Sequence, residues 1–388
     1  MDEYLMAVLA KLKTNDYKGL TIVLGNESCD LDSAVSSVVY ALFLNWQYNQ
    51  IRCKVCTREN RPDTVKDDIF VPILNVSRLD YPLKTEVVFL FKMYGIFENH
   101  LVFRDDYDIK DLISKSESKV VLVDHHTLSK NDKFLSTLVT EIIDHRPIDK
   151  SQWTFKEDTR TTIQTVGSCC TLVAQRIKDL SHLLTREAEF FRSYPVCCNL
   201  IHATIILDTV NFSKEVNKAT PHDEEIVLFL ENLMTVDNHE SERRRILDYL
   251  LSARSDVSTL NAAQLLKKDV KIVGNVLVPS FPILVKDFLK KPEAQSAVDE
   301  ALCNLGCSTA LLLGMELSHG LKRDAAVYSS RNQETADVLS KHLEEWTQPQ
   351  LGLAPEKLPY ATGFSYFWQS NLTASRKQYI PAVSAFNH

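Results

Sequence analysis

Acidic residues and histidines follow short apolar runs at four places in the first half of the chain. The four are the segments 25–33 (GNESCDLDS), 124–126 (DHH) and 144–146 (DHR), and the single residue Asp208. Carboxylates combined with one or two imidazoles are ligands for hard divalent cations rather than for a thiolate zinc site. Once gathered, such carboxylates need neutralising charge, because like charges resist joint ionisation. The pattern therefore predicts a centre of two divalent cations, of the kind that hydrolyses phosphate bonds.

The elements that must position these clusters follow an alternating pattern. Apolar, β-branched runs predict strands at 20–24, 71–76, 101–104, 120–123 and 141–143. Amphipathic stretches predict helices at 33–44, 172–180 and 199–207. This alternation is typical of an open parallel α/β sheet, whose ligands bind outside the carboxyl ends of the strands. We expect three of the clusters to converge there and Asp208 to reach the same place from a helix.

The length of 388 residues predicts two domains. The polar charge run 237–245 is the predicted boundary between a metal-binding domain, 1–236, and a smaller α/β substrate-binding domain, 246–388. In the second domain we expect helices at 246–253 and 262–268 and from 282 to 289, and strands at 270–278 and 309–313. The polar stretch 45–68 has no clear period, so it is interpreted as a surface insertion.

Composition excludes several classes of protein. The chain has 44 basic and 51 acidic residues, a net charge of −7 that does not favour a general nucleic-acid binder. No stretch is long and apolar enough for a membrane span, and no signal peptide is expected. The nine cysteines are an odd number and include adjacent pairs, which does not fit a disulfide framework. A reducing compartment, most simply the cytoplasm, is predicted.

Each cluster also has a plain structural interpretation. An isolated Asp30 or Asp32 is more often a helix N-cap, because Asp accepts hydrogen bonds from free backbone N–H groups. A His-His pair is more often structural. The four clusters together, each on an apolar run, favour the metal centre.

Several segments resemble a known family. Residues 124–126, followed twenty residues later by 144–145, resemble the signature of the DHH phosphoesterases. The segment 373–378 (TASRKQ) is similar to the Ser-Arg-Lys element of their DHHA2-type second domain, which family II inorganic pyrophosphatases share. Segments 25–33 and 144–148 are more similar still to the prune-type exopolyphosphatases. The resemblance implies a DHH domain and a DHHA2 domain with the active site between them, completed by their closure.

The resemblance also implies roles for individual residues. Asp30 and Asp124, with Asn26 beside them, would hold one cation. The second cation would be held by Asp32, Asp124, His145 and Asp208, with Asp124 bridging. The implied catalytic residues are Asp124, His125, His126 and Arg146. Substrate phosphates would be bound by His126, Arg146, Lys271, Arg376 and Lys377.

Two residues depart from the pyrophosphatase pattern. Asn26 stands where those enzymes have a histidine, and Arg146 stands where they have a second one. A neutral amide is a weaker ligand, which favours Mg²⁺, with Mn²⁺ or Co²⁺ as alternatives. Both departures fit the prune pattern and argue against pyrophosphate as the preferred substrate.

We therefore expect a short-chain exopolyphosphatase that acts on tri- and tetrapolyphosphate, a small anionic substrate. Three alternatives stay open: a cyclic-nucleotide or oligonucleotide phosphodiesterase, an inorganic pyrophosphatase, and a regulatory partner of nucleoside diphosphate kinase with weak catalysis. No membrane partner is expected.

Overall fold

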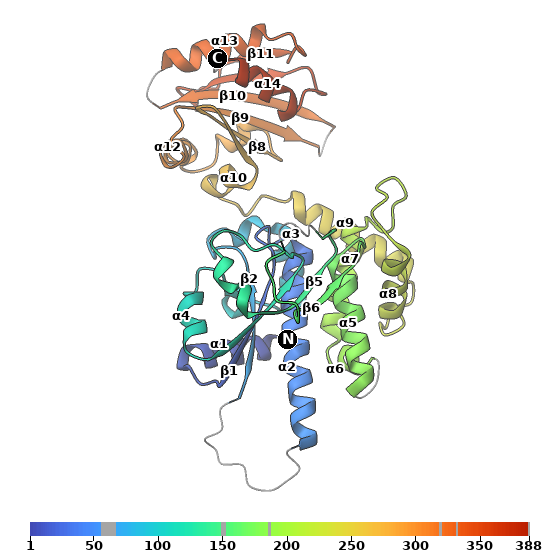
Figure 1. Ribbon diagram of the computed structural model, residues 1–388. Helices are drawn as coiled ribbons and strands as arrows, with labels where there is room; N and C mark the ends of the chain where they lie inside the picture. Colours follow the sequence, from blue (N-terminus) through green and yellow to red (C-terminus); the bar gives the residue numbers. More distant parts are fainter. Residues whose placement is uncertain (56–66, 149–152, 185–187, 318–319, 331–332, 387–388) are drawn as a thin grey trace. The chain divides into compact units, whose positions relative to one another are not determined.

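The computed structural model describes residues 1–55, 67–148, 153–184, 188–317, 320–330 and 333–386. It contains two compact units, Met1–Arg254 and Ser255–His388, each built around one six-stranded sheet (Figure 1). The predicted α/β class with two domains is confirmed.

The sheet of the first unit is parallel throughout, in the order β3-β2-β1-β4-β5-β6. Its strands are β1 (Gly19–Leu24), β2 (Ile69–Leu74), β3 (Val102–Phe103), β4 (Glu117–Val123), β5 (Val139–Asp144) and β6 (Arg160–Ile163). The first five are the predicted strands. The strand order reverses between β1 and β4, and open α/β sheets bind ligands at such a point.

Helices cover both faces of this sheet. They are α1 (Asp2–Thr14), α2 (Leu31–Val55), α3 (Thr85–Met93), α4 (Ile109–Ser114), α5 (Cys169–Leu184), α6 (Glu189–Ser193), α7 (Pro195–Asp208), α8 (Pro221–Glu231) and α9 (His239–Ser255), with 3₁₀ turns η1 (Tyr81–Leu83), η2 (Glu98–His100) and η3 (Lys133–Leu138). Alternate residues of β4 point to opposite faces. Val121 and Val123 join the core with α2, α5 and α7, whereas Val120 and Leu122 join the core with α1 and α4.

Two predictions about this unit are corrected. The insertion expected at 45–68 is in its first part the continuation of helix α2, where Trp46 is only 5% exposed; residues 56–66 lie outside the described part. The charge run 237–245, predicted as a linker, largely forms the start of helix α9. Ile246 and Leu250 of α9 are buried in the core of the first unit, and the two compact units divide after Arg254, whereas the predicted domain bounds stay a prediction.

The second unit has a mixed sheet in the order β11-β12-β10-β9-β8-β7. Its strands are β7 (Val270–Val273), β8 (Val276–Phe281), β9 (Thr309–Glu316), β10 (Lys322–Ser329), β11 (Leu353–Glu356) and β12 (Ser365–Gln369). Its helices are α10 (Ala262–Lys268), α11 (Val285–Phe288), α12 (Ala294–Asn304), α13 (Gln333–Glu345) and α14 (Arg376–Phe386). The single strand predicted at 270–278 is a hairpin, because Gly274 adopts a positive φ of 58° and turns the chain.

Among the helices of the described residues, none combines the length and the apolar character that crossing a bilayer requires.

Candidate metal centre

Asp124 directly follows β4 at the point where the strand order reverses. Its backbone N–H still donates to the carbonyl of Ile143 on β5, at 2.9 Å. Its φ is +61°, a left-handed conformation that Asp tolerates better than most residues. The carboxylate turns inward and is 1% exposed. The end of the strand thus places a buried carboxyl group at the edge of the sheet.

Asp32 is the second residue of α2 and is held by another helix. Its two carboxylate oxygens accept hydrogen bonds from the backbone N–H groups of Cys169, at 2.6 Å, and Cys170, at 2.8 Å. These groups lie in the first turn of α5, where free N–H donors and the helix dipole favour a negative charge. Asp32 is therefore fixed in orientation by backbone N–H groups.

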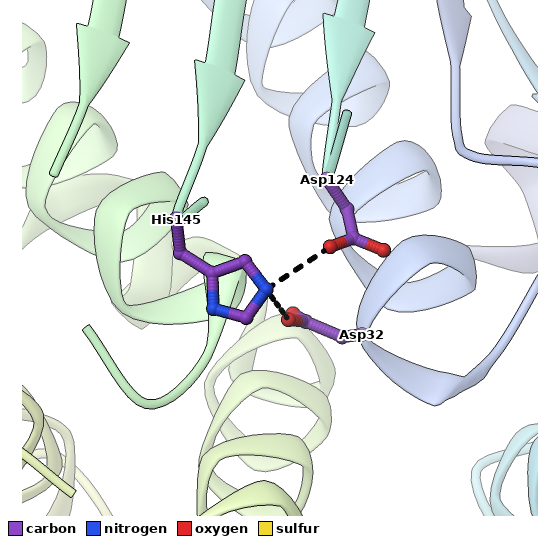
Figure 2. A group of neighbouring side chains, drawn as sticks. All are labelled: Asp32, Asp124 and His145. Carbon is purple, nitrogen blue, oxygen red and sulfur yellow. Dashed lines mark ion pairs between the residues drawn. The ribbon is translucent and has the colours of Figure 1, made fainter. Parts of the chain in front are cut away.

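His145 completes a cluster with these two carboxylates (Figure 2). Its Nδ1 lies 3.1 Å from the carbonyl of Val166, so Nδ1–H donates there and Nε2 is the atom that faces the carboxylates. Nε2 is 3.3 Å from Asp124 Oδ1 and 4.0 Å from Asp32 Oδ2. The three candidate ligand atoms all lie within 4.8 Å of one another. Metal-binding histidines use this arrangement, in which the second ring nitrogen is held by a carbonyl.

The electrostatics of the cluster are those of an incompletely neutralised site. Burial raises the pKa of Asp124 to about 7, and the nearby charges of Asp32 and Asp30 add to this effect. Burial disfavours the charged form of His145, yet its contacts with Asp124 and Asp32 raise its pKa to about 9. Protons retained on Asp124 and His145 thus offset the excess negative charge, and a bound cation would displace these protons.

Asp208 is the last residue of helix α7, and its surroundings also indicate that positive charge is missing. Burial, followed by the charge of Asp32, raises its pKa well above the usual range. Its Oδ1 lies 3.7 Å from Nζ of Lys218, a side chain that is 43% exposed. Its Oδ2 is buried and makes no hydrogen bond of normal geometry with the described residues, although an interaction with the hydroxyl of Ser168 lowers the pKa of Asp208 in part. A buried carboxylate oxygen without a partner is a position where a bound ion or a water molecule would be accommodated.

Asp30 and Asp32 differ in role although they are two residues apart. Asp30 is half-buried, and its Oδ1 accepts a hydrogen bond of 3.1 Å from the N–H of Ser33. The helix-capping interpretation of the sequence therefore describes Asp30, which caps α2, and does not describe Asp32. The charge of Asp30 still acts on Asp124 and Asp208 by raising the pKa of each.

Asn26 follows β1 and contacts Asp124 through its amide nitrogen. Nδ2 donates to the carboxylate of Asp124 and also to its carbonyl, at 3.2 Å. The amide oxygen accepts from the backbone N–H of Ser28 at 2.7 Å and from its hydroxyl. An NH₂ group is a donor and does not ligate a metal. In this arrangement Asn26 holds Asp124, and its role as a ligand stays a prediction.

A cavity of about 410 Å³ lies beside the cluster. His125 and His126 both line it. His125 donates from Nδ1 to the carbonyl of Val123 at 3.0 Å, and burial lowers its pKa, so it is neutral. Nδ1 of His126 pairs with Oδ2 of Asp144, which leaves Nε2 as the outward nitrogen.

Asp144 has a clear structural task that the sequence analysis did not assign. It is completely buried, and besides His126 it binds the N–H of His145 at 2.8 Å through Oδ1. Its position at the end of an apolar strand was the available signal. Arg146, also in the lining of the cavity, extends a guanidinium to 3.5 Å from Asp124 Oδ1 and is half exposed.

The three basic residues predicted in the second unit lie close in that unit's structure. Arg376 begins α14 and donates to Asp269, through one nitrogen to its carbonyl at 2.9 Å and through another to its carboxylate at 2.5 Å. Lys271, on the adjacent strand β7, and Lys377 are exposed. Their role as phosphate ligands stays a prediction.

The donor set fits a hard divalent cation. Asp32 and Asp124 supply carboxylate oxygens and His145 supplies a ring nitrogen in the required tautomer. These are the oxygen-rich ligands, with one imidazole, that suit Mg²⁺ or Mn²⁺. Asp208, which has one buried oxygen without a partner among the described residues, does not belong to the group whose ligand atoms lie within 4.8 Å of one another, so its role as a ligand stays a prediction. The arrangement is that of a metal-dependent hydrolase.

Comparison with known families agrees with this class. Residues 21–200 match the model of the DHH family N-terminal domain, and residues 248–386 match that of the DHHA2 domain. The chain therefore belongs to the DHH family, with a DHHA2 domain following the DHH domain. The resemblance predicted from the sequence is confirmed.

Its similarity to individual proteins extends over its whole length. It is 31% identical to human exopolyphosphatase PRUNE1 over 398 aligned residues, covering 100% of this chain and 80% of the human protein. It is 35% identical to bovine exopolyphosphatase PRUNE1, again with 100% and 80% coverage. A solved structure from Methanococcus jannaschii, titled as a family II inorganic pyrophosphatase, matches with 19% identity and a TM-score of 0.45, covering 94% of this chain and 98% of that one. That likeness is too low to inform the site.

Proposed function

We propose that this protein is a divalent-metal-dependent exopolyphosphatase that releases terminal phosphate from short polyphosphates such as tri- and tetraphosphate. The observation that carries the proposal is the cluster of Asp32, Asp124 and His145, whose ligand atoms lie within 4.8 Å of one another beside a cavity of about 410 Å³. The similarity to proteins named exopolyphosphatase PRUNE1, which covers all of this chain and 80% of those proteins, supports the substrate class.

Two cations are proposed, with Mg²⁺ preferred and Mn²⁺ or Co²⁺ able to substitute. Asp124 is shared between them. Asp30 is assigned to the first cation with Asn26 beside it, and Asp32, His145 and Asp208 are assigned to the second. When bound, two such cations neutralise phosphate oxygens and activate a water molecule. The partnerless Oδ2 of Asp208 is the strongest support for its inclusion.

The side chains around the cavity have separate tasks in this proposal. Arg146 binds phosphate oxygens through its planar guanidinium, which suits bidentate contact. Asp144 holds Nδ1 of His126, so that Nε2 of His126 is directed to the substrate and contacts the leaving oxygen. His125 is neutral and tied to Val123, which suits a lining role beside the reacting groups.

The reaction is a hydrolysis with a simple balance. A water oxygen bonds to the terminal phosphorus, and the bridging P–O bond to the rest of the chain breaks. Orthophosphate and a polyphosphate shorter by one unit are formed, with the water's protons shared between the products and solvent. The chain's own contribution is to orient the terminal phosphate and to hold charge that opposes its negative oxygens.

Further parts of the proposal rest on the family resemblance. Lys271, Arg376 and Lys377 are proposed to bind the substrate phosphates, and nucleoside diphosphate kinase is proposed as a protein partner. The buried free thiols, among them Cys169 and Cys197, support a reducing compartment such as the cytoplasm.

A substrate panel tests the proposal. Purified protein is assayed with Mg²⁺, and separately with Mn²⁺ and Co²⁺, on tripolyphosphate, tetrapolyphosphate, pyrophosphate and cyclic AMP. We expect phosphate release from the two polyphosphates at a higher kcat/KM than from pyrophosphate, and no turnover of cyclic AMP. Preference for cyclic AMP would contradict the proposed exopolyphosphatase activity and favour a phosphodiesterase. Inactivity on the whole panel with every metal would overturn the proposal that the protein is a hydrolase.

A further inference from the structure

One short segment of backbone, 166–171, contacts two of the proposed metal ligands. The carbonyl of Val166 accepts the hydrogen bond from Nδ1 of His145, at 3.1 Å, which fixes the tautomer and the ring plane of that histidine. Three and four residues later, the N–H groups of Cys169 and Cys170 bind both oxygens of Asp32, at 2.6 and 2.8 Å. A shift of this segment would therefore move an imidazole and a carboxylate of the centre together.

The segment is held in turn by Asp223, a residue in the first turn of α8. Asp223 Oδ2 accepts a hydrogen bond from the N–H of Gly167 at 2.8 Å, and Oδ1 accepts one from the hydroxyl of Thr171 at 2.5 Å. Oδ2 also accepts from the N–H and the hydroxyl of Thr220, each at 2.7 Å. Asp223 is completely buried, so these four bonds define its position.

The packing at Gly167 shows how closely the segment is clamped. A Cβ atom there would lie 2.6 Å from Cγ2 of Thr209 and 2.9 Å from Oδ2 of Asp223, distances that real side chains do not reach. Thr209 directly follows Asp208, the proposed ligand at the end of α7. Gly167 is therefore enclosed between the end of α7 and the start of α8.

We propose that Asp223 is a positioning residue that sets the metal affinity of the centre through the segment 166–171. The inference rests on the proposed function, because it takes Asp32 and His145 as metal ligands. Residues that orient ligands without touching the metal contribute substantially to affinity, since a ligand held in place loses little freedom on binding. Asp223 acts at one remove further, by fixing the backbone groups that orient two ligands at once.

The test is a calorimetric titration of the metal-free 388-residue chain with Mn²⁺. Asp223→Ala removes all four hydrogen bonds and is expected to raise the Kd for Mn²⁺ by roughly 10-fold, the lower end of the range for outer partners of metal ligands. Asp223→Asn keeps an oxygen acceptor for Gly167 and is expected to fall between Asp223→Ala and the wild type. This graded rescue is a response that a general loss of stability does not give.

Glu231→Gln provides a matched control on the same helix. Glu231 is a buried carboxylate at the other end of α8, bonded to His202 at 3.0 Å and to Arg243 at 2.6 Å instead of to the segment. Glu231→Gln should lower the stability of the protein and leave the Kd for Mn²⁺ unchanged. An equal rise of Kd in Glu231→Gln would overturn the inference, because α8 as a whole would then be responsible.

Two further variants keep the inference testable if Asp223→Ala does not fold. Thr171→Val removes one hydrogen bond of Asp223 at constant volume, and Gly167→Ala forces the segment away from Asp223. Both should raise the Kd for Mn²⁺, and hydrolysis by Thr171→Val should recover at saturating Mn²⁺. If the wild type binds Mn²⁺ and every folded variant binds it equally well, the inference about Asp223 fails while the proposed function stands. If the wild type binds no Mn²⁺, the proposed function fails.

Discussion

The first unit buries carboxylates in two different ways. Glu141, on β5, is 1% exposed and is matched by two arginines: Arg160 approaches one oxygen to 3.1 Å, and Arg176 approaches the other to 3.0 Å. Glu231 is likewise matched by His202 and Arg243. In both places the chain supplies the positive charge that a buried anion needs, so the group serves the stability of the fold.

The metal centre contains the same chemical group with a weaker match. Asp32 is held by backbone N–H groups, and Asp208 has an oxygen that lacks a partner among the described residues. Asp124 contacts His145 and the half-exposed Arg146, at 3.3 and 3.5 Å, yet its pKa is still raised to about 7, mainly by burial. The comparison indicates that counter-charge, rather than burial itself, separates a structural carboxylate from one proposed to bind a cation.

The largest expected effect is on activity. Asp124→Asn should lower kcat on tripolyphosphate by roughly 1000-fold or more, because a neutral amide does not bridge two cations. Asn also tolerates the left-handed backbone at this position, so the fold is kept. Glu141→Gln, the control, should keep kcat near the wild-type value. Steady-state kinetics of both variants measures this difference. An equal loss of activity in Glu141→Gln and Asp124→Asn would contradict the distinction between the two kinds of buried carboxylate.

The second effect is on stability in the absence of metal, and it runs in the opposite direction. Glu141→Gln leaves two arginines without their anion and should lower the free energy of unfolding by about 3 kcal/mol. Asp124→Asn removes a carboxylate whose charged form is disfavoured by burial, and it should leave the stability of the metal-free protein unchanged or raise it. Urea denaturation with EDTA present measures both, and a larger loss in Asp124→Asn would contradict the distinction.

The smallest expected effect is on how stability depends on pH when a buried carboxylate is paired with basic side chains, as Glu231 is. Burial opposes the charge on Glu231, yet His202 and Arg243 lower its pKa from 4.5 to about 2. A carboxylate whose pKa is lower in the folded state stabilises above its unfolded value and loses that contribution as the pH falls through its folded value. Glu231→Gln should therefore cost roughly 2 kcal/mol at pH 6, and the difference should shrink between pH 4.5 and 2. A difference that stays constant over this interval would show that the charge of Glu231 is not involved.

The sequence predicted those elements whose pattern is local. Apolar runs predicted strands β1 to β5, and the acidic and histidine clusters predicted Asp32, Asp124 and His145, which the structure brings together. The edge strand β6 was missed because its sequence, RTTI, has no apolar run and is half exposed. The hairpin formed by β7 and β8 was predicted as one strand because β-branched residues continue on both sides of the turn at Gly274.

The residues that support the ligands were hidden for a different reason. Asp223 lies in the sequence Thr-Pro-His-Asp, which predicts a capped helix, and the capping box with Thr220 is indeed present. Its contacts with Gly167 and Thr171 join positions more than fifty residues apart. One sequence alone carries no local signal for such contacts, because they depend on how α5 and α8 pack.

The central claim is that Asp32, Asp124 and His145 gather to hold a divalent cation. Anomalous diffraction from crystals of the Mn²⁺-loaded protein tests this most directly, because it locates manganese independently of the protein atoms. The account predicts a peak bounded by these three side chains and a second peak on the other side of Asp124. Protein that has bound Mn²⁺ in solution but shows its peaks elsewhere, with these three side chains free of metal, would contradict it.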